Sequence, residues 1–224
     1  MNHRPLVPDA PHLALADWRR RVAETYAAVR SSGAPAEERL AAYRATRQAL
    51  FAQHPASPIT AAARHGWAGL QYYPFDPSLS LSAPLEPDPD APSVGVPRSG
   101  GGLGIPFVRI GWVSFHLGET DSRLAVYWLE EYAGGVFIPF RDATSGGETY
   151  GAGRYLWDSA KGADLGFDGD AIILDFNYAY HPSCVYDPIW SCPLAPPENP
   201  SERWYAASAL PGCFCSMSML PRSS

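Results

Sequence analysis

The sequence predicts an α+β protein: a pair of N-terminal helices, then a mainly β body that forms an antiparallel barrel or roll, with a split barrel as one form of it. Hydrophobic residues recur every three or four positions before residue 64. Short aromatic and β-branched segments, separated by glycine, proline and aspartate, follow from Gly69. The whole chain has 23 prolines and 20 glycines, about 19% of its 224 residues, against roughly 12% on average. Short apolar segments separated by turn residues are typical of antiparallel strands.

The first 64 residues are expected to form two helices that pack on the body. One face of the first helix carries Leu15, Trp18, Val22, Tyr26 and Val29, and Gly33 can end this helix. The second helix is expected to start at Pro35 and to end before His54. Its first turn holds two glutamates, which suit a helix N-terminus, and its apolar face carries Leu40, Tyr43, Leu50 and Phe51.

Residues 65–199 are expected to form the β-rich body. The predicted strands are the segments GLQYYPFDP, IPFVRIGWVSFHL, SRLAVYWLEE, GGVFIPF, ETYGAGRYLW and DAIILDFNY. In residues 107–117, alternation places Phe107 and Val113 on one face, and Trp112 and His116 on the other. Residues 82–104 are rich in proline, glycine and serine and predict a long loop, either a flap over a site or an insertion. Residues 200–224 form an atypical tail with no clear strand pattern.

Charge is distributed unevenly around a net charge of −6. Residues 1–64 hold nine arginines against five acidic residues, whereas residues 65–224 hold eight basic against eighteen acidic residues. Docking of the basic segment on the acidic body explains this better than nucleic-acid binding. We find no signal-peptide pattern and no long apolar run, so we expect a soluble cytoplasmic protein without a membrane partner.

Residues 141–156 offer the parts of an anion cradle. Arginines hold anions by charge and forked geometry, hydroxyls add hydrogen bonds, and glycines admit backbone N–H groups. The candidate ligand-binding residues here are Arg141, Thr144, Ser145, Thr149, Tyr150 and Arg154. The alternative is a structural hairpin in which Asp142 and Thr144 cap the turn and Arg154 pairs with a carboxylate.

A second polar cluster follows the apolar segment AIILDF. Asp175 is a candidate catalytic acid or base, Tyr180 a candidate proton donor, and Asn177 a candidate to orient a substrate carbonyl. The alternative is that these side chains satisfy the backbone of a proline-rich loop.

His181, Cys184 and Cys192 are a candidate zinc site, because imidazole and thiolate are ligands that zinc prefers. The spacing lacks the paired cysteines that structural zinc sites usually have. A Cys184–Cys192 disulfide and two reduced buried thiols are the competing interpretations.

Several strings together resemble one family. The strings are HPASP, YYPFDP, FIPFRDATSGGETYGAGRYL and DFNYAYHPSCVYDPIWSCPLAPPEN, and over roughly residues 18–199 the chain resembles the bacterial and archaeal family catalogued as domain of unknown function 1684. The resemblance implies that the last two strings act as one unit, but it implies no established activity. His181 stands where the family usually has asparagine, which weakens zinc as a shared feature.

These observations lead to one functional hypothesis and two alternatives. We expect a pocket for an anionic small molecule between the Arg141–Arg154 hairpin and the Asp175–Asn199 loop. One alternative is a non-catalytic β module with an internal polar network, and the other is a split barrel that binds flavin phosphate. The residues leave enzymatic activity, the cofactor and the oligomeric state open.

Overall fold

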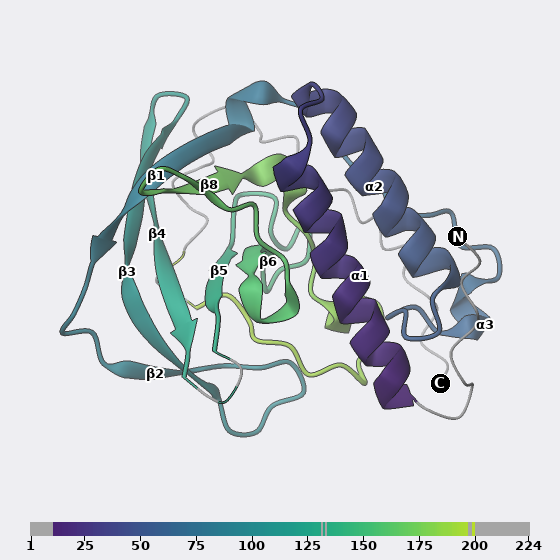
Figure 1. Cartoon of the computed structure of the whole chain (residues 1–224). Coiled ribbons are helices and arrows are strands. Elements are labelled where there is room, and N and C mark those ends of the chain that lie inside the picture. Colours follow the sequence, from purple (N-terminus) through teal and green to yellow (C-terminus); the bar gives the residue numbers. More distant parts are fainter. Residues whose placement is uncertain (1–10, 131, 133, 197–198, 200–224) are drawn as a thin grey trace.

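The computed structural model describes residues 11–130, 132, 134–196 and 199 (Figure 1). Its helices are α1 (Pro11–Ser31), α2 (Ala36–Gln53) and α3 (Ala61–Arg64). The strands are β1 (Ser80–Pro87), β2 (Ser93–Val96), β3 (Ile105–Leu117), β4 (Thr120–Leu129), β5 (Val136–Phe140), β6 (Arg154–Asp158), β7 (Phe167–Asp168) and β8 (Ala171–Asp175). Among these residues, no helix is both long enough and apolar enough to cross a membrane.

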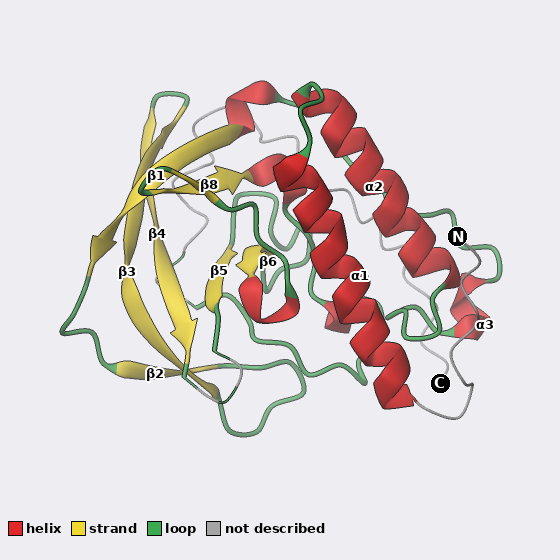
Figure 2. Ribbon diagram, in the orientation of Figure 1, coloured by secondary structure: helices red, strands yellow, loops and turns green. Residues whose placement is uncertain are grey.

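The described strands form one eight-stranded antiparallel sheet curled into a half-barrel, in the order β6-β5-β4-β3-β1-β8-β7, with β2 paired to β3 (Figure 2). The two ends of the sheet approach each other. Tyr155 of β6 and Tyr180, just beyond β8, exchange backbone hydrogen bonds of 2.9 and 3.1 Å. The Trp157 indole N–H donates to the carbonyl of Ile173 at 2.9 Å. The predicted α+β fold with an antiparallel roll is confirmed.

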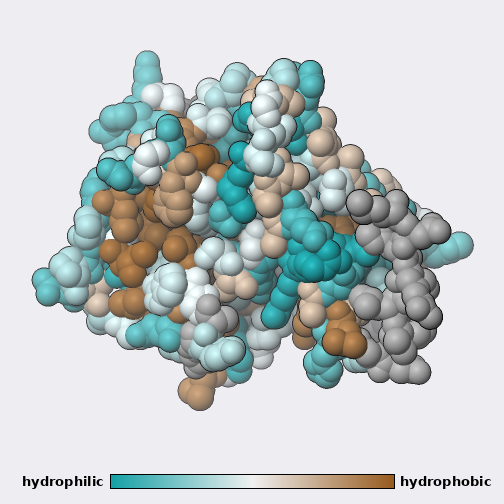
Figure 3. Space-filling model, viewed as in Figure 1, coloured by the Kyte–Doolittle hydropathy of each residue, from teal (hydrophilic) through white to brown (hydrophobic). Residues whose placement is uncertain are grey.

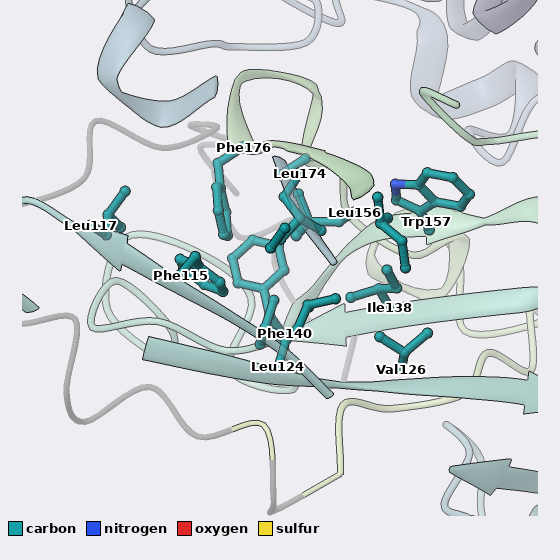
Figure 4. Close-up of a cluster of buried hydrophobic side chains, with 14 of the residues drawn as sticks. Phe115, Leu117, Leu124, Val126, Ile138, Phe140, Leu156, Trp157, Leu174 and Phe176 are labelled. Atoms are coloured by element: carbon teal, nitrogen blue, oxygen red, sulfur yellow. The ribbon is translucent and has the colours of Figure 1, made fainter. Parts of the chain in front are cut away.

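The main core lies inside the curl of the sheet (Figure 4). Phe140 from β5 meets Phe176 edge-to-face at 5.3 Å between ring centres, and Leu124, Ile138 and Leu174 are fully buried around them. Fully burying a side chain of this size stabilises the fold by roughly 1.5–3 kcal/mol. The core therefore fixes the positions of the loops that leave β5, β6 and β8.

The helix pair packs on the side of the body next to the end of β8. Tyr26 of α1 and Tyr43 of α2 share a hydrogen bond of 3.0 Å between their hydroxyls, and the Tyr43 ring lies 4.8 Å from that of Tyr178. Arg30 of α1 pairs with Asp164 of the body at 2.9 Å. Hydrophilic residues prevail along the outer face of α1, and apolar residues gather over the strands at the left of the view (Figure 3).

Two expectations about the strands are wrong. Residues 69–77 contain no strand, and β2 and most of β1 lie within residues 82–104, the segment expected to be a loop. β1 forms because it is paired on both sides, first with β8 through residues 80–84 and then with β3 through residues 85–87. Pro84 is in the last residue pair between β1 and β8, and Pro87 is in the last pair between β1 and β3. At the end of a strand pairing, the missing N–H of proline removes little hydrogen bonding from the sheet.

Other expectations hold with small changes. In β3 the predicted alternation is present beyond Gly111: Val113 and Phe115 are buried while Ser114 and His116 are exposed. A bulge between Arg109 and Gly111 shifts the register before that point. Pro35 precedes α2 as its N-cap. The predicted boundaries at residues 64 and 199 stay predictions, and the tail of residues 200–224 lies outside the described residues.

Candidate functional site

The loop between β5 and β6 closes on itself through a buried ion pair. Arg154 donates to the carboxylate of Asp142, and their side chains are 3% and 1% exposed. The same carboxylate accepts the Thr144 hydroxyl at 2.6 Å and, more weakly, the Ser145 hydroxyl at 3.4 Å. The Thr144 and Thr149 hydroxyls are 2.9 Å apart. Four of the expected anion-binding side chains therefore satisfy one another or Asp142, which favours the structural alternative for them.

This hairpin and the later proline-rich loop lie against each other, as the resemblance implied. The Arg141 backbone N–H donates to the carbonyl of Asn199 at 3.3 Å. A side chain at Gly153 (φ +99°) would lie 2.8 Å from the Ala195 methyl group.

Asn199, at the end of the proline-rich loop, binds the backbone of two strands of the sheet. It is fully buried, its Nδ2 donates to the carbonyls of Pro139 (2.6 Å) and Ala125 (3.2 Å), and its Oδ1 accepts from the Ala125 N–H at 2.7 Å. A buried amide with three such bonds holds strands β4 and β5 to the end of the loop.

Asp175 and Asn177 tie the end of β8 to the segment before β1. The Asp175 carboxylate accepts the Asn177 backbone N–H at 2.9 Å and its Nδ2 at 2.8 Å, while the Asn177 amide bonds both backbone groups of Asp76 at 3.0 and 2.8 Å. Burial raises the pKa of Asp175, and the hydrogen bonds from Asn177 and Ser80 partly oppose this.

The two residues expected to be catalytic do not share a cavity. Asp175 lines an open hollow with Arg39 and Tyr178, whereas Tyr180 lines a separate cavity beneath the helices. Burial raises the pKa of Tyr180 well above its usual value, so its hydroxyl stays neutral at physiological pH. The geometry gives no support for a joint Asp175–Tyr180 acid–base pair.

His181, Cys184 and Cys192 lie on the loop after β8. Cys184 and Cys192 are free thiols rather than a disulfide. In the described part of the chain, no three His, Cys, Asp or Glu side chains are grouped so that they could hold a metal ion. The zinc hypothesis therefore receives no support from the arrangement.

A partly open cavity of about 130 Å³ lies between the helix pair and the body, where α1, α2, β6 and the loop after β8 meet. Its apolar wall includes Trp18 and Val22 of α1 and Phe51 of α2. The charged residues that line it are Arg19, Arg47, Asp158 and Lys161. Lys161 pairs with Asp158 at 2.8 Å, so the two arginines leave this cavity with positive charge.

Arg47 is the half-buried cation of this cavity. Its guanidinium lies 4.9 Å from the ring centre of Phe51 and 4.8 Å from that of Tyr180. Within the part of the chain that the structure describes, the guanidinium contacts these two rings and takes part in no ion pair or hydrogen bond. Cation–π contacts of this kind contribute about 0.5–2 kcal/mol each, and they leave the N–H donors of the guanidinium available.

Sequence reasoning did not select Arg47, although a signal for it exists. Tyr43, Arg47 and Phe51 follow each other at four-residue spacing, so the arginine stands within the apolar stripe of α2. A cation on the buried face of an amphipathic helix needs a local partner, and this pattern is visible without a structure.

Comparisons with known proteins agree with the fold. The family described as Protein of unknown function (DUF1684) matches residues 65–202. The solution NMR structure of an uncharacterized protein from Haloarcula marismortui is similar, with 30% identity, a TM-score of 0.56, and coverage of 81% of this chain and 95% of that chain. A search of curated proteins finds no match. The chain therefore belongs to the DUF1684 family of proteins of unknown function.

Proposed function

We infer that the protein binds a small anionic molecule with an apolar, ring-sized body in the cavity between the helix pair and the sheet, and that Arg47 is its anchor. The observation that carries this function is Arg47, which lines the cavity and whose guanidinium lies over two aromatic rings of that cavity without an acceptor among the described residues. This keeps the expected ligand class and moves its anchor from the Arg141–Arg154 hairpin to α2.

Charge and shape support this ligand class. A guanidinium stays protonated at physiological pH and offers five N–H donors in a plane that matches carboxylate or phosphate oxygens. Trp18 and Phe51 give the rest of the cavity an aromatic wall, which suits the body of a ligand rather than a bare inorganic ion. Tyr180 also lines the cavity, with its ring centre 4.8 Å from the Arg47 guanidinium, and its hydroxyl is neutral.

The volume of the cavity limits the size of the ligand. About 130 Å³ is well below the roughly 300–1,000 Å³ of sites that enclose drug-sized ligands. A flavin mononucleotide would need a larger space, so the cavity favours a single ring that carries one carboxylate or phosphate.

The hairpin has a different role in this account. The Arg154–Asp142 pair with its threonines belongs to a buried polar network, which supports the internal-network alternative for this part of the chain. Because the hairpin packs on the loop that supplies Tyr180 and Cys192, we infer that it holds one wall of the cavity in place.

Thermal unfolding in the presence of benzoate, phenyl phosphate and the neutral analogue benzamide tests the function. A ligand present at a hundred times its dissociation constant stabilises the folded state by about 2.7 kcal/mol, which corresponds to a rise of about 5–11 °C in Tm for a chain of this size. We expect at least one of the two anions, but not benzamide, to raise Tm in this way.

Variants test whether the rise in Tm depends on Arg47. Arg47→Gln should abolish the rise, and Arg47→Lys should reduce it, because lysine keeps the charge but loses the planar fork. Arg123→Gln is the matched control, since Arg123 also stacks on an aromatic ring, 4.1 Å from the centre of Trp112, but does not line the cavity. Equal stabilisation by benzamide, no stabilisation by either anion, or an unchanged response of Arg47→Gln would refute the proposed function.

A further inference from the structure

A larger hollow lies where the C-terminal end of α1 and the start of α2 meet strands β1 and β8 (Figure 1). Its volume is about 520 Å³, within the roughly 300–1,000 Å³ of small-molecule sites. Ser80 pairs with Asp175 and Ser82 with Ile173 across the two strands, so these four residues share the face of the sheet that borders the hollow. No described residue lines both this hollow and the cavity of Arg47.

Arg39 and Asp175 bring opposite charges to this hollow without neutralising each other. The Arg39 Nη1 donates to the carbonyl of Ala34 at 3.0 Å, and its Nε is enclosed and has no hydrogen-bond partner in the described part of the chain. Asp175 is 7% exposed, and its carboxylate accepts bonds of 2.9 and 2.8 Å from the backbone N–H and the side-chain amide of Asn177. Among the described residues, neither charge forms an ion pair. Hydrogen bonds between opposite charges are about twice as strong as neutral ones, so both side chains can still gain a stronger partner.

The other polar groups of the hollow fit this pattern. Arg30 is already paired with Asp164 at 2.9 Å, so Arg39 supplies the positive charge that a ligand meets. Asp168 of β7 adds an exposed carboxylate. Tyr178 is only 4% exposed, and its hydroxyl is enclosed without a hydrogen-bond partner among the described residues. Such groups are rare in folded proteins, so this hydroxyl indicates that a polar group is missing from the hollow.

We propose that the hollow binds a free α-amino acid with an aliphatic side chain, whose carboxylate pairs with Arg39 and whose ammonium group pairs with Asp175. Two unpaired charges of opposite sign in one hollow carry this assignment. A guanidinium offers several donors to a carboxylate, and an aspartate accepts from an ammonium group. The aliphatic side chain packs on the apolar residues that line the hollow: Val29, Leu81, Leu165 and Ile173.

Ligands with a single charge fit this hollow less well. A simple anion meets the carboxylates of Asp168 and Asp175 as well as Arg39, and a simple cation leaves Arg39 without a partner and is repelled by it. A zwitterion neutralises both charges at once. Burial raises the pKa of Asp175, and a ligand ammonium group favours its ionised form.

Isothermal titration calorimetry on the full chain tests the assignment. Leucine and valine are titrated into the wild type, together with the amide of each, which lacks the carboxylate, and the N-acetyl derivative of each, which lacks the ammonium group. We expect at least one of the two amino acids to bind saturably, with one molecule per chain. Neither of its derivatives should bind as tightly, because each leaves one charge of the hollow without a partner. These comparisons do not depend on whether any variant folds.

Variants test whether binding occurs in this hollow. Arg39→Gln and Asp175→Asn should each weaken the binding of the amino acid about 10- to 150-fold, the range expected for losing a hydrogen bond to a charged group. Arg44→Gln is the control. Arg44 also stands on α2, donates to a backbone carbonyl, that of Tyr73 at 2.9 Å, and has an enclosed Nε without a described partner, but it does not line the hollow. Its substitution should leave the dissociation constant unchanged.

No saturable binding of either amino acid, equal binding of the amide or the N-acetyl derivative, or an unchanged dissociation constant in Arg39→Gln would overturn the proposal. A loss of amino-acid binding in Arg47→Gln would also contradict it, because it would place the amino acid in the other cavity. The titrations contain no aromatic anion, so they succeed or fail independently of the function proposed for the cavity of Arg47.

Discussion

Replacing Arg154 with methionine should destabilise the protein strongly, because it leaves the Asp142 carboxylate buried without its cation. The two side chains are 3% and 1% exposed, so water cannot replace the lost partner. Removing one member of a buried pair costs roughly 3–5 kcal/mol. At about 2–4 °C per kcal/mol for a chain of this length, Tm should fall by about 6–20 °C.

Arg109→Met is the matched control. Arg109 also pairs with a carboxylate, Asp88, at 2.8 Å and also lies over an aromatic ring, 4.7 Å from Trp112, as Arg154 lies 4.9 Å from Phe140. Its ion pair is about a quarter exposed, so its loss should cost less than about 1 kcal/mol.

Urea unfolding of Arg154→Met, of Asp142→Asn and of the double variant Arg154→Met/Asp142→Asn measures the coupling free energy between Arg154 and Asp142. We expect the double variant to lose clearly less than the sum of the single losses, since each partner is costly mainly when it is left alone. Additive losses, or a loss below about 1 kcal/mol for Arg154→Met together with weaker ligand binding, would refute the structural role and restore Arg154 as an anion anchor.

Two further predictions concern Asn199, which is buried, and Asp17, which is partly buried. Asn199→Leu should lower the unfolding free energy in urea by at least about 3 kcal/mol, because it strands three buried backbone groups of Ala125 and Pro139 at about 1–3 kcal/mol each; a loss below about 1 kcal/mol would contradict this. Burial would raise the pKa of Asp17, but hydrogen bonds from His54 and two arginines together lower it well below its usual range. The stability from this group is therefore present above the unfolded pKa of about 3.9 and is lost as the pH falls. Between pH 5 and pH 2 the Tm of the wild type should fall more steeply than that of Asp17→Asn. If the two curves of Tm against pH stay parallel, titration of Asp17 does not cause the loss of stability.

The helix pair was predictable because its signal is local. Apolar residues at three- and four-residue spacing bury one face of each helix, whatever the rest of the chain does. β1 was not predictable in the same way, because its pairing partners, β3 and β8, lie about 25 and 90 residues further along the chain and only they fix its register. Proline-rich residues 80–87 become a strand only when both partners are present.

The candidate site was predictable in part. The sequence joined residues 141–156 to the loop after Asp175, and the two are in contact. It also allowed Arg154 to pair with a carboxylate as the alternative. The sequence could not distinguish Arg154 from Arg47. Arg154 forms an ion pair within its own hairpin, whereas Arg47 forms none among the described residues and lies over two aromatic rings. The residue type alone does not tell which arginine already has a carboxylate partner.

The most direct test of the account is a ¹⁵N NMR titration of the folded protein with benzoate, observing the Arg47 Nε–H and the backbone amides. The account predicts that the Arg47 side-chain signal and the amides of Tyr180 and Cys192 shift together and saturate, and that these shifts vanish in Arg47→Gln. Shifts that centre on Arg141 and Arg154, or that persist unchanged in Arg47→Gln, would contradict it.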